Sequence, residues 1–146
     1  MLELAGVTRW LLVLGSNANA HSLLALARAD LSALGEMVNS SRSIEGADIG
    51  GGQQPYLNQL VELQMDADVD AVRAAAKRIE LQHGRSPLRM ASGICDLDID
   101  VVAQLDGAGL TWLADKPCRI PAVQQLLRER LGDPLPGTEL AGTNLC

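Results

Sequence analysis

The sequence predicts one α+β domain with the ferredoxin-like order β-α-β-β-α-β, in which an antiparallel sheet carries helices packed on one face. Short apolar runs typical of strands alternate with segments whose apolar residues recur every three or four positions, as in helices. The chain has 146 residues, a length typical of one domain, so residues 1–146 are assigned to a single domain. Hydrophobic residues make up 47% and aromatic residues 2%, which predicts an aliphatic core.

The first half of the chain is predicted to contain three strands and one helix. Residues 10–14 are continuously apolar and end at Gly15, which indicates a buried strand. Residues 20–34 have helical spacing and end at Gly35, a typical helix C-cap. Two further strands are predicted, a polar edge strand over 38–45 and a half-buried strand over 56–64, separated by a flexible glycine-rich loop over 46–55.

The second half is predicted to contain two helices and one strand. A helix over 69–83 follows the acidic turn at 66–70, and a loop over 85–93 leads into a strictly alternating strand over 96–105. After an irregular stretch, a helix is expected over 122–131. Residues 132–146 are rich in Pro, Gly and Thr and are predicted to form a flexible tail.

The charge balance excludes several classes of function. The chain carries 12 Lys and Arg against 18 Asp and Glu, a net charge of −6, which argues against nucleic-acid binding. Its apolar runs are too short to cross a bilayer, and no signal peptide is recognisable, so no membrane partner and a cytoplasmic location are expected. The three cysteines form no C-x-x-C pair, which argues against a zinc site.

An acidic pair at the start of the last predicted strand is the main candidate for chemistry. Asp96 and Asp98 are two positions apart, which places their carboxylates on one face of a strand about 6.6 Å apart. Such a pair is a predicted Mg²⁺ site, with water and substrate phosphate as the other ligands. Asp100 continues the same face. The alternative is a solvated acidic face of an antiparallel strand.

Basic residues gather immediately before this acidic strand. Five of the twelve cations fall between positions 73 and 89, namely Arg73, Lys77, Arg78, Arg85 and Arg89. Local positive charge beside a metal site suits a nucleoside triphosphate, whose phosphates both groups neutralise, and Lys77 is a predicted nucleotide-binding residue. The alternative is an ordinary surface helix with salt bridges.

Two polar motifs lie at the ends of predicted strands. Gly15, Ser16 and Asn17 follow the first strand, where the backbone could approach a substrate phosphate, although a tight turn is an equally good interpretation. Tyr56 and Asn58 lie two apart at the start of a strand and hence on one face. There the amide could pair with the edge of a heterocycle and the ring could pack against it, or the pair could simply begin a strand.

Four separated motifs together resemble one family. They are Val13-Leu-Gly-Ser-Asn17, Gln54-Pro-Tyr-Leu-Asn58, Arg78-Ile-Glu-Leu-Gln-His-Gly-Arg85 and Cys95-Asp-Leu-Asp-Ile99. In this order and spacing they resemble 6-hydroxymethyl-7,8-dihydropterin pyrophosphokinase of folate biosynthesis. The resemblance implies a ferredoxin-like fold, ATP and a reduced pterin as substrates, and transfer of pyrophosphate to the pterin with release of AMP.

The resemblance also implies site residues. Asp96 and Asp98 would bind two Mg²⁺ ions, Asn58 would read the pterin edge and Tyr56 would form one wall of its pocket. Glu80 and Arg85 match a conformation-setting glutamate and a catalytic-loop arginine near ATP, respectively. Glu80 and Arg85 are therefore predicted nucleotide-binding residues, and Arg85 is also a predicted catalytic residue. Gly15, Ser16 and Asn17 are predicted to bind the substrate together with Tyr56 and Asn58.

The sequence departs from the family pattern before the acidic strand. The family has a Trp-Gly-Pro-Arg type of sequence there, whereas this chain has Arg89-Met-Ala-Ser-Gly93 in a stretch shorter by about two residues. Arg89 is the predicted catalytic substitute for the missing arginine. The aromatic that stacks on the pterin in the family aligns with Leu126 or Leu127.

Three functions therefore follow from the sequence. The first is a pterin pyrophosphokinase that acts as a monomer or homodimer, with reduced or altered activity. The second is a non-catalytic paralogue that binds a nucleotide or a pterin. The third is a ferredoxin-like interaction module whose acidic strand is merely solvated.

Overall fold

The computed structural model describes residues 7–46 and 55–132. Most of the predicted glycine-rich loop over 46–55, and all but the first residue of the predicted tail over 132–146, lie outside these residues. The elements, in chain order, are β1 (Arg9–Ser16), α1 (Ala20–Ser32), β2 (Glu36–Gly46), β3 (Tyr56–Gln64), α2 (Val69–Gln82), α3 (Pro87–Ala91), β4 (Asp98–Asp106), β5 (Gly109–Trp112), the 3₁₀-helix η2 (Pro117–Arg119) and α4 (Pro121–Leu131).

One antiparallel sheet forms the centre of the molecule. Its strand order is β2-β3-β1-β4-β5, and each neighbouring pair runs antiparallel. The first four strands have the arrangement of the predicted β-α-β-β-α-β unit, which confirms the ferredoxin-like fold. β5 extends the sheet beyond β4.

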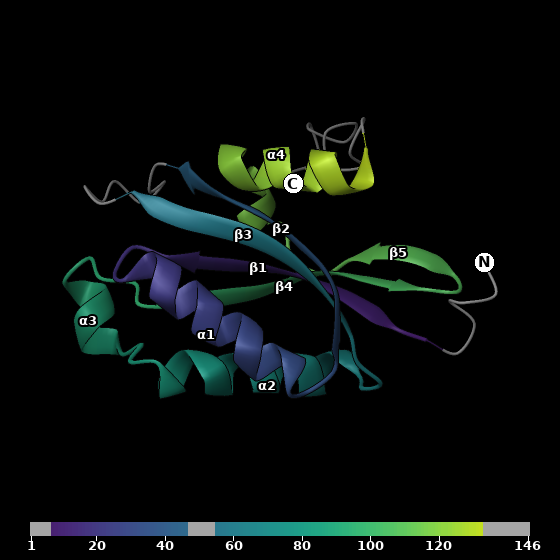
Figure 1. Cartoon of the computed structure of the whole chain (residues 1–146), viewed down its shortest axis with the longest axis horizontal. Coiled ribbons are helices and arrows are strands. Elements are labelled where there is room, and N and C mark those ends of the chain that lie inside the picture. Colours follow the sequence, from purple (N-terminus) through teal and green to yellow (C-terminus); the bar gives the residue numbers. More distant parts are fainter. Residues whose placement is uncertain (1–6, 47–54, 133–146) are drawn as a thin grey trace.

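Helices cover both faces of this sheet. The two helices of the ferredoxin-like unit, α1 and α2, lie on one face, as predicted for that unit, whereas α4 lies on the opposite face (Figure 1). The central strand β1 explains why both faces need cover. Trp10, Leu12 and Leu14 point to the α1 and α2 side and Leu11 and Val13 to the α4 side, so this strand is apolar throughout.

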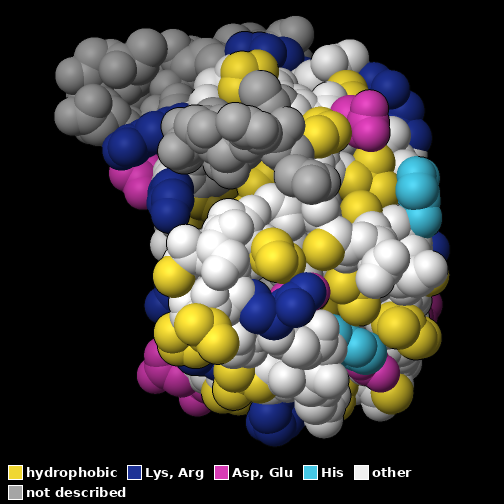
Figure 2. All heavy atoms as spheres, turned by 90° about the vertical axis from the view of Figure 1, so that its left-hand side faces the viewer, with side chains coloured by type: hydrophobic (Ala, Val, Ile, Leu, Met, Phe, Trp, Pro, Cys, Tyr) yellow, Lys and Arg dark blue, Asp and Glu magenta, His cyan; other side chains and the backbone are white. Residues whose placement is uncertain are grey.

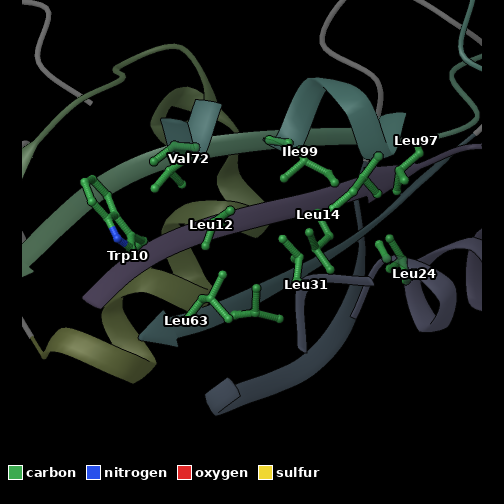
Figure 3. Close-up of a cluster of buried hydrophobic side chains, with 14 of the residues drawn as sticks. Trp10, Leu12, Leu14, Leu24, Leu31, Leu63, Val72, Leu97 and Ile99 are labelled. Carbon is green, nitrogen blue, oxygen red and sulfur yellow. The ribbon is translucent and has the colours of Figure 1, made fainter. Parts of the chain in front are cut away.

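The larger apolar layer lies between the sheet and helices α1 and α2. Figure 3 shows its aliphatic side chains from β1, β3, β4 and both helices interdigitating around Leu12 and Leu14. Trp10 closes one end, and its indole Nε1 donates to the carbonyl oxygen of Met65 at 3.0 Å. The polar atom of the one large aromatic in this layer is thus satisfied. Aliphatic packing dominates, as the composition predicts.

The second apolar layer joins the sheet to α4. Val123, Leu126 and Leu127 of this helix pack on Leu11 and on residues of β3 and β4. Leu126 and Leu127 are therefore core residues of this layer.

Among the described residues, no helix is long and apolar enough to cross a membrane.

Two elements were not predicted. The predicted loop over 85–93 contains the short helix α3, which begins at Pro87, and the side chain of Ser86 accepts from the backbone N–H of Arg89 as an N-cap. The stretch after Asp106 is not irregular at first, because a tight turn there leads into β5. Gly109 lies in this hairpin with φ +118°, a conformation that favours glycine.

Candidate active site

A cavity of about 540 Å³ opens on the α4 side of the sheet, where β1 ends and β3 and β4 begin. This volume is in the range of sites for small organic ligands. One wall comes from α3 and the segment that follows it, and another from η2 and the start of α4. The described residues that line the cavity are Val13, Gly15, Tyr56, Asn58, Arg85, Met90, Gly93, Ile94, Cys95, Asp98, Asp100, Lys116, Pro117 and Ile120.

The floor of the cavity contains the predicted amide and aromatic pair. Tyr56 and Asn58 both line it, as their spacing on one strand predicts. Asn58 is 3% exposed, and its amide nitrogen makes only long hydrogen bonds, at 3.4 Å to the carbonyl oxygen of Tyr56 and 3.5 Å to that of Ile44. A Cβ at Gly15 would lie 3.6 Å from atoms of both side chains. A side chain at this position would therefore contact both residues, and glycine leaves their surfaces uncovered on this side.

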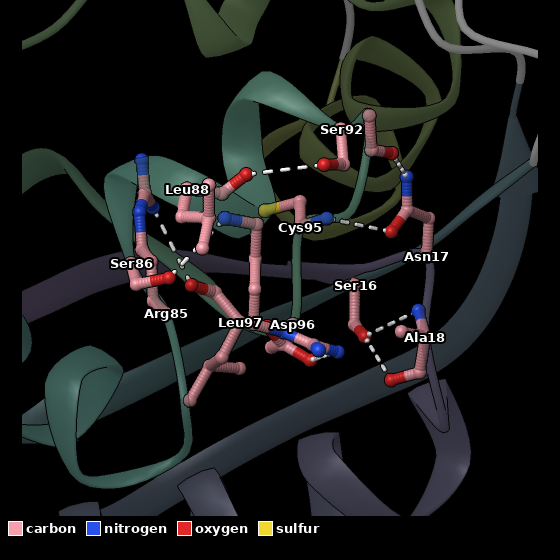
Figure 4. Close-up of polar contacts among 12 residues, drawn as sticks. Ser16, Asn17, Ala18, Arg85, Ser86, Leu88, Ser92, Cys95, Asp96 and Leu97 are labelled. Atoms are coloured by element: carbon pink, nitrogen blue, oxygen red, sulfur yellow. Dashed lines mark hydrogen bonds and ion pairs between the residues drawn. The ribbon is translucent and has the colours of Figure 1, made fainter.

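The other two residues of the Gly-Ser-Asn motif lie outside the cavity lining. Ser16 is fully buried, and its hydroxyl bonds the backbone of Ala18. Asn17 holds the wall that follows α3. Its side chain donates to the carbonyl oxygen of Gly93 at 2.9 Å and accepts from the N–H of Cys95 at 2.7 Å (Figure 4). The structure thus places Asn17 where it positions a wall of the cavity, whereas the Ser16 hydroxyl binds the backbone two residues further on.

The acidic residues in the cavity are Asp98 and Asp100. Both lie on β4, where alternation turns their side chains to the same face while Ile99 points into the core. Asp96 precedes the strand and does not line the cavity.

The environment of Asp98 and Asp100 suits a divalent cation. Burial, followed by the nearby charge of Asp98, raises the pKa of Asp100 to about 8. Two carboxylates that repel each other in a cavity are the donor set that Mg²⁺ accepts, with water and phosphate completing its shell. Among the described residues, no group of three or more His, Cys, Asp or Glu side chains is gathered to hold a metal. The carboxylates of Asp98 and Asp100 therefore fit an ion such as Mg²⁺, which binds one or two carboxylates in proteins.

Asp96 instead makes an ion pair with Arg89. The guanidinium donates to both carboxylate oxygens, at 2.6 Å from Nε and 2.8 Å from Nη2. These hydrogen bonds lower the pKa of the Asp96 carboxyl, which is 6% exposed. Arg89 does not line the cavity. The pair fastens α3 to the segment before β4.

Arg85 is the guanidinium that reaches the cavity. Its Nη1 lies 2.5 Å from Oδ1 of Asp98 and 3.2 Å from Oε2 of Glu80. Glu80 also accepts from the backbone N–H of Ile99 at 2.7 Å, and burial raises the pKa of its carboxyl. Glu80 thereby ties the end of α2 to β4 and orients Arg85 toward the acidic pair.

Lys77 and Lys116 differ in their position relative to the cavity. Lys77 is exposed on α2 and does not line the cavity. Lys116, at the start of η2, does line it. None of the sequence motifs singled out Lys116, because it reaches the cavity only through the packing of η2.

Comparison with known proteins identifies the family. A search of curated protein sequences finds no match. The sequence model of the family described as 7,8-dihydro-6-hydroxymethylpterin-pyrophosphokinase (HPPK) matches residues 11–136, which is most of the chain. The matched region contains every described residue that lines the cavity. The chain therefore belongs to the 7,8-dihydro-6-hydroxymethylpterin-pyrophosphokinase family.

Proposed function

We propose that the protein transfers a pyrophosphoryl group from ATP to the hydroxymethyl oxygen of 6-hydroxymethyl-7,8-dihydropterin, as a Mg²⁺-dependent enzyme of folate biosynthesis. The observation that carries this proposal is the shared cavity, in which the carboxylates of Asp98 and Asp100 face the same space as the Tyr56 and Asn58 side chains. A metal-binding pair beside an amide and an aromatic ring suits two substrates held side by side.

The pterin would occupy the β3 side of the cavity. Asn58 offers a buried amide that can both donate to and accept from the edge of a heterocycle. Tyr56 is the only aromatic side chain among the described lining residues, so stacking on one ring contributes about 0.5–1.5 kcal/mol. Gly15 lies directly beside these two residues and adds no side chain to this part of the cavity.

The triphosphate would lie beside Asp98 and Asp100. When bound there, two Mg²⁺ ions would neutralise phosphate charge that develops during transfer. In the proposed transfer, the hydroxymethyl oxygen attacks the β-phosphorus and its hydroxyl proton passes to solvent. The bond from this phosphorus to the oxygen that bridges it to the α-phosphate breaks, and AMP leaves with that oxygen. Arg85, oriented by Glu80, contributes positive charge beside Asp98.

The α3 wall would keep water from the phosphates. Asn17 and the Arg89–Asp96 pair hold this wall against β1 and the start of β4. Excluding water matters because hydrolysis of ATP competes with transfer to the pterin. In this proposal Arg89 acts as a positioning residue that fixes α3. A cytoplasmic location and a monomeric or homodimeric state remain predictions.

The test is formation of AMP from ATP with and without Mg²⁺ and the hydroxymethyl dihydropterin. Asp98→Asn and Asp100→Asn should each lower kcat by about 10²-fold or more, because each removes a charge that holds the metal. Asp96→Asn should cost less than either, because its partner is Arg89. Asp66→Asn, in an exposed turn, is the matched control and should leave the rate unchanged.

Two results would overturn the proposal. One is AMP formation by the wild type no faster than by the Asp98→Asn, Asp100→Asn double variant. The other is a reaction that needs Asp96 and not Asp100, which would return the metal to the pair predicted from the sequence. Binding of Mg·ATP or pterin without any AMP would instead identify a non-catalytic member of the family.

A further inference from the structure

Lys116 is a cation of the cavity that the sequence motifs do not include. It lies at the start of η2 and is exposed. Pro117 and Ile120 next to it also line the cavity, and η2 leads directly into α4, which is packed on the sheet. The backbone that follows Lys116 is therefore fixed by the packing of η2 and α4.

Two arginines near the cavity, Arg85 and Arg89, form ion pairs with carboxylates. Arg85 contacts both Asp98 and Glu80, so its charge is shared between two carboxylates. Arg89 is held by Asp96 outside the cavity lining. Lys116, by contrast, forms no ion pair with any residue in the ranges 7–46 and 55–132. Of the two described cations that line the cavity, Lys116 is the one without an ion-pair partner in the part of the chain that the structure describes.

The surroundings fit an anionic ligand beside this lysine. Figure 2 shows the end of the molecule that carries α3, where basic and acidic side chains both lie mostly toward the edges of the view and one group of Lys or Arg atoms lies near its centre. The chain as a whole carries a net charge of −6. The described lining of the cavity balances two carboxylates, Asp98 and Asp100, with two cations, Arg85 and Lys116. A divalent cation held by the carboxylates would add positive charge that, together with Lys116, favours a polyanion at this place.

We propose that Lys116 binds the polyphosphate of the nucleotide and supplies the cationic role of the arginine that this chain lacks before the acidic strand. This inference rests on the proposed function, because it assigns a ligand to the same cavity. An ammonium group is a compact point charge that suits phosphate oxygens, whereas the pterin ring is neutral and offers it no comparable partner. Lys116 should therefore affect the nucleotide and not the pterin.

Calorimetry of binding separates this inference from catalysis. The probe is Mg²⁺ with the α,β-methylene analogue of ATP, in which the bond that must break is replaced. Lys116→Met should weaken its affinity by about tenfold or more, and Lys116→Arg should restore most of it, because one charge-assisted contact is lost and then regained. Raising the salt concentration should weaken wild-type binding more than binding by Lys116→Met.

The matched control is Arg119→Met, which removes an equal charge from the same short helix. Arg119 pairs with Asp115 at 3.1 Å on the surface and does not line the cavity, so its loss should leave nucleotide affinity unchanged. Affinity for the hydroxymethyl dihydropterin should be the same in all four proteins. Thermal unfolding should confirm that each variant is folded, since both side chains are exposed.

The outcomes distinguish the two proposals. If Lys116→Met binds the analogue as tightly as the wild type, the role of Lys116 is overturned, whether or not AMP is formed. If the wild type does not bind the analogue, both the role of Lys116 and the proposed function are overturned. If binding falls in Lys116→Met but the wild type forms no AMP, Lys116 holds the nucleotide of a non-catalytic protein and only the proposed activity is overturned.

Discussion

The guanidinium of Arg89 binds the carboxylate of Asp96 through two parallel hydrogen bonds, and the pair fixes α3 to the chain just before β4. The planar guanidinium of arginine, which donates two parallel hydrogen bonds, fixes the orientation of a carboxylate more specifically than the ammonium of a lysine does. Arg89 itself is 46% exposed, so water screens part of its charge. The pair thus orders the wall and contributes little to global stability.

Arg89→Met should therefore have a small and pH-dependent effect. Arg89 lowers the pKa of Asp96 in the folded protein, so the stability gained is present above the ordinary aspartate value of about 4 and is lost as the pH falls through the lower folded value. At pH 7 the variant should unfold at most about 4 °C below the wild type. The difference should shrink as the pH approaches 3.

Thermal unfolding followed by circular dichroism across this pH range measures the effect. Arg119→Met again serves as the control, because Arg119 pairs with a more exposed carboxylate. A difference between wild type and Arg89→Met that stays constant from pH 7 to pH 3 would show that the ion pair is not its cause. Faster proteolysis of residues near α3 in the variant would support the positioning role.

At the scale of elements, the connection between α1 and β2 depends on close backbone approach. Gly35 lies between these elements, and a Cβ there would collide with the carbonyl oxygen of Gln64 and lie 3.2 Å from Cβ of Met65. Both neighbours belong to the end of β3 or the residue after it. The backbone atom cannot move without distorting the β2–β3 pairing that ends there.

Gly35→Ala should therefore destabilise the protein by about 1–3 kcal/mol, a typical cost of forcing extra atoms into a packed place. Urea unfolding measures this free energy, with Ser32→Ala as an exposed control on the last turn of α1. Equal stability of Gly35→Ala and the wild type would show that the turn can relax away from β3.

The start of β4 decides which carboxylates belong to the cavity. Regular pairing between β1 and β4 ends where Gly15 faces Asp98. Beyond this pair, the backbone N–H of Asn17 still donates to the carbonyl oxygen of Cys95 at 3.0 Å, and the Asn17 side chain binds the backbone of Gly93 and Cys95. Asp96 therefore lies before the strand and loses the alternation that the sequence predicts for it. A strand boundary set by a distant partner strand is not visible in the local pattern.

At the scale of the whole molecule, the two apolar layers have different consequences for the cavity. Leu31 lies in the layer under α1 and α2, and Leu127 lies in the layer under α4. Both side chains are fully or almost fully buried, at 1% and 0% exposure. Only the α4 layer borders the wall of η2 that carries Lys116.

Leu31→Ala and Leu127→Ala should each cost about 2–5 kcal/mol of stability, because each leaves a cavity in a packed layer. The two variants should differ in their affinity for the nucleotide. At a temperature where both are folded, Leu127→Ala should bind the methylene analogue of Mg·ATP more weakly than Leu31→Ala does, because η2 and α4 move together. Urea unfolding and calorimetry measure the two effects, and equal nucleotide affinity would contradict the coupling.

The resemblance and the local patterns predicted much of this architecture. The order of the first six elements, the aliphatic core and the placement of Tyr56 and Asn58 on one face follow from short-range spacing, which residues a few positions apart decide. The local patterns could not show that α4 covers the second face of the sheet. That position depends on β1 being apolar on both sides and on where a helix later in the chain packs. The short elements α3 and β5 carry too few residues for a period to be recognised.

By itself, the sequence determined that this chain belongs to a ferredoxin-like family with an acidic strand, an amide and aromatic pair and a nearby arginine, since each of these is a property of neighbouring positions. Only the tertiary structure decided that Asp98 and Asp100, and not Asp96, face the cavity, and that Lys116 replaces Lys77 as the lysine beside it. The physical reason is that the cavity is built from segments far apart in the chain. Which side chains meet there depends on strand register and helix packing, both of which are long-range properties.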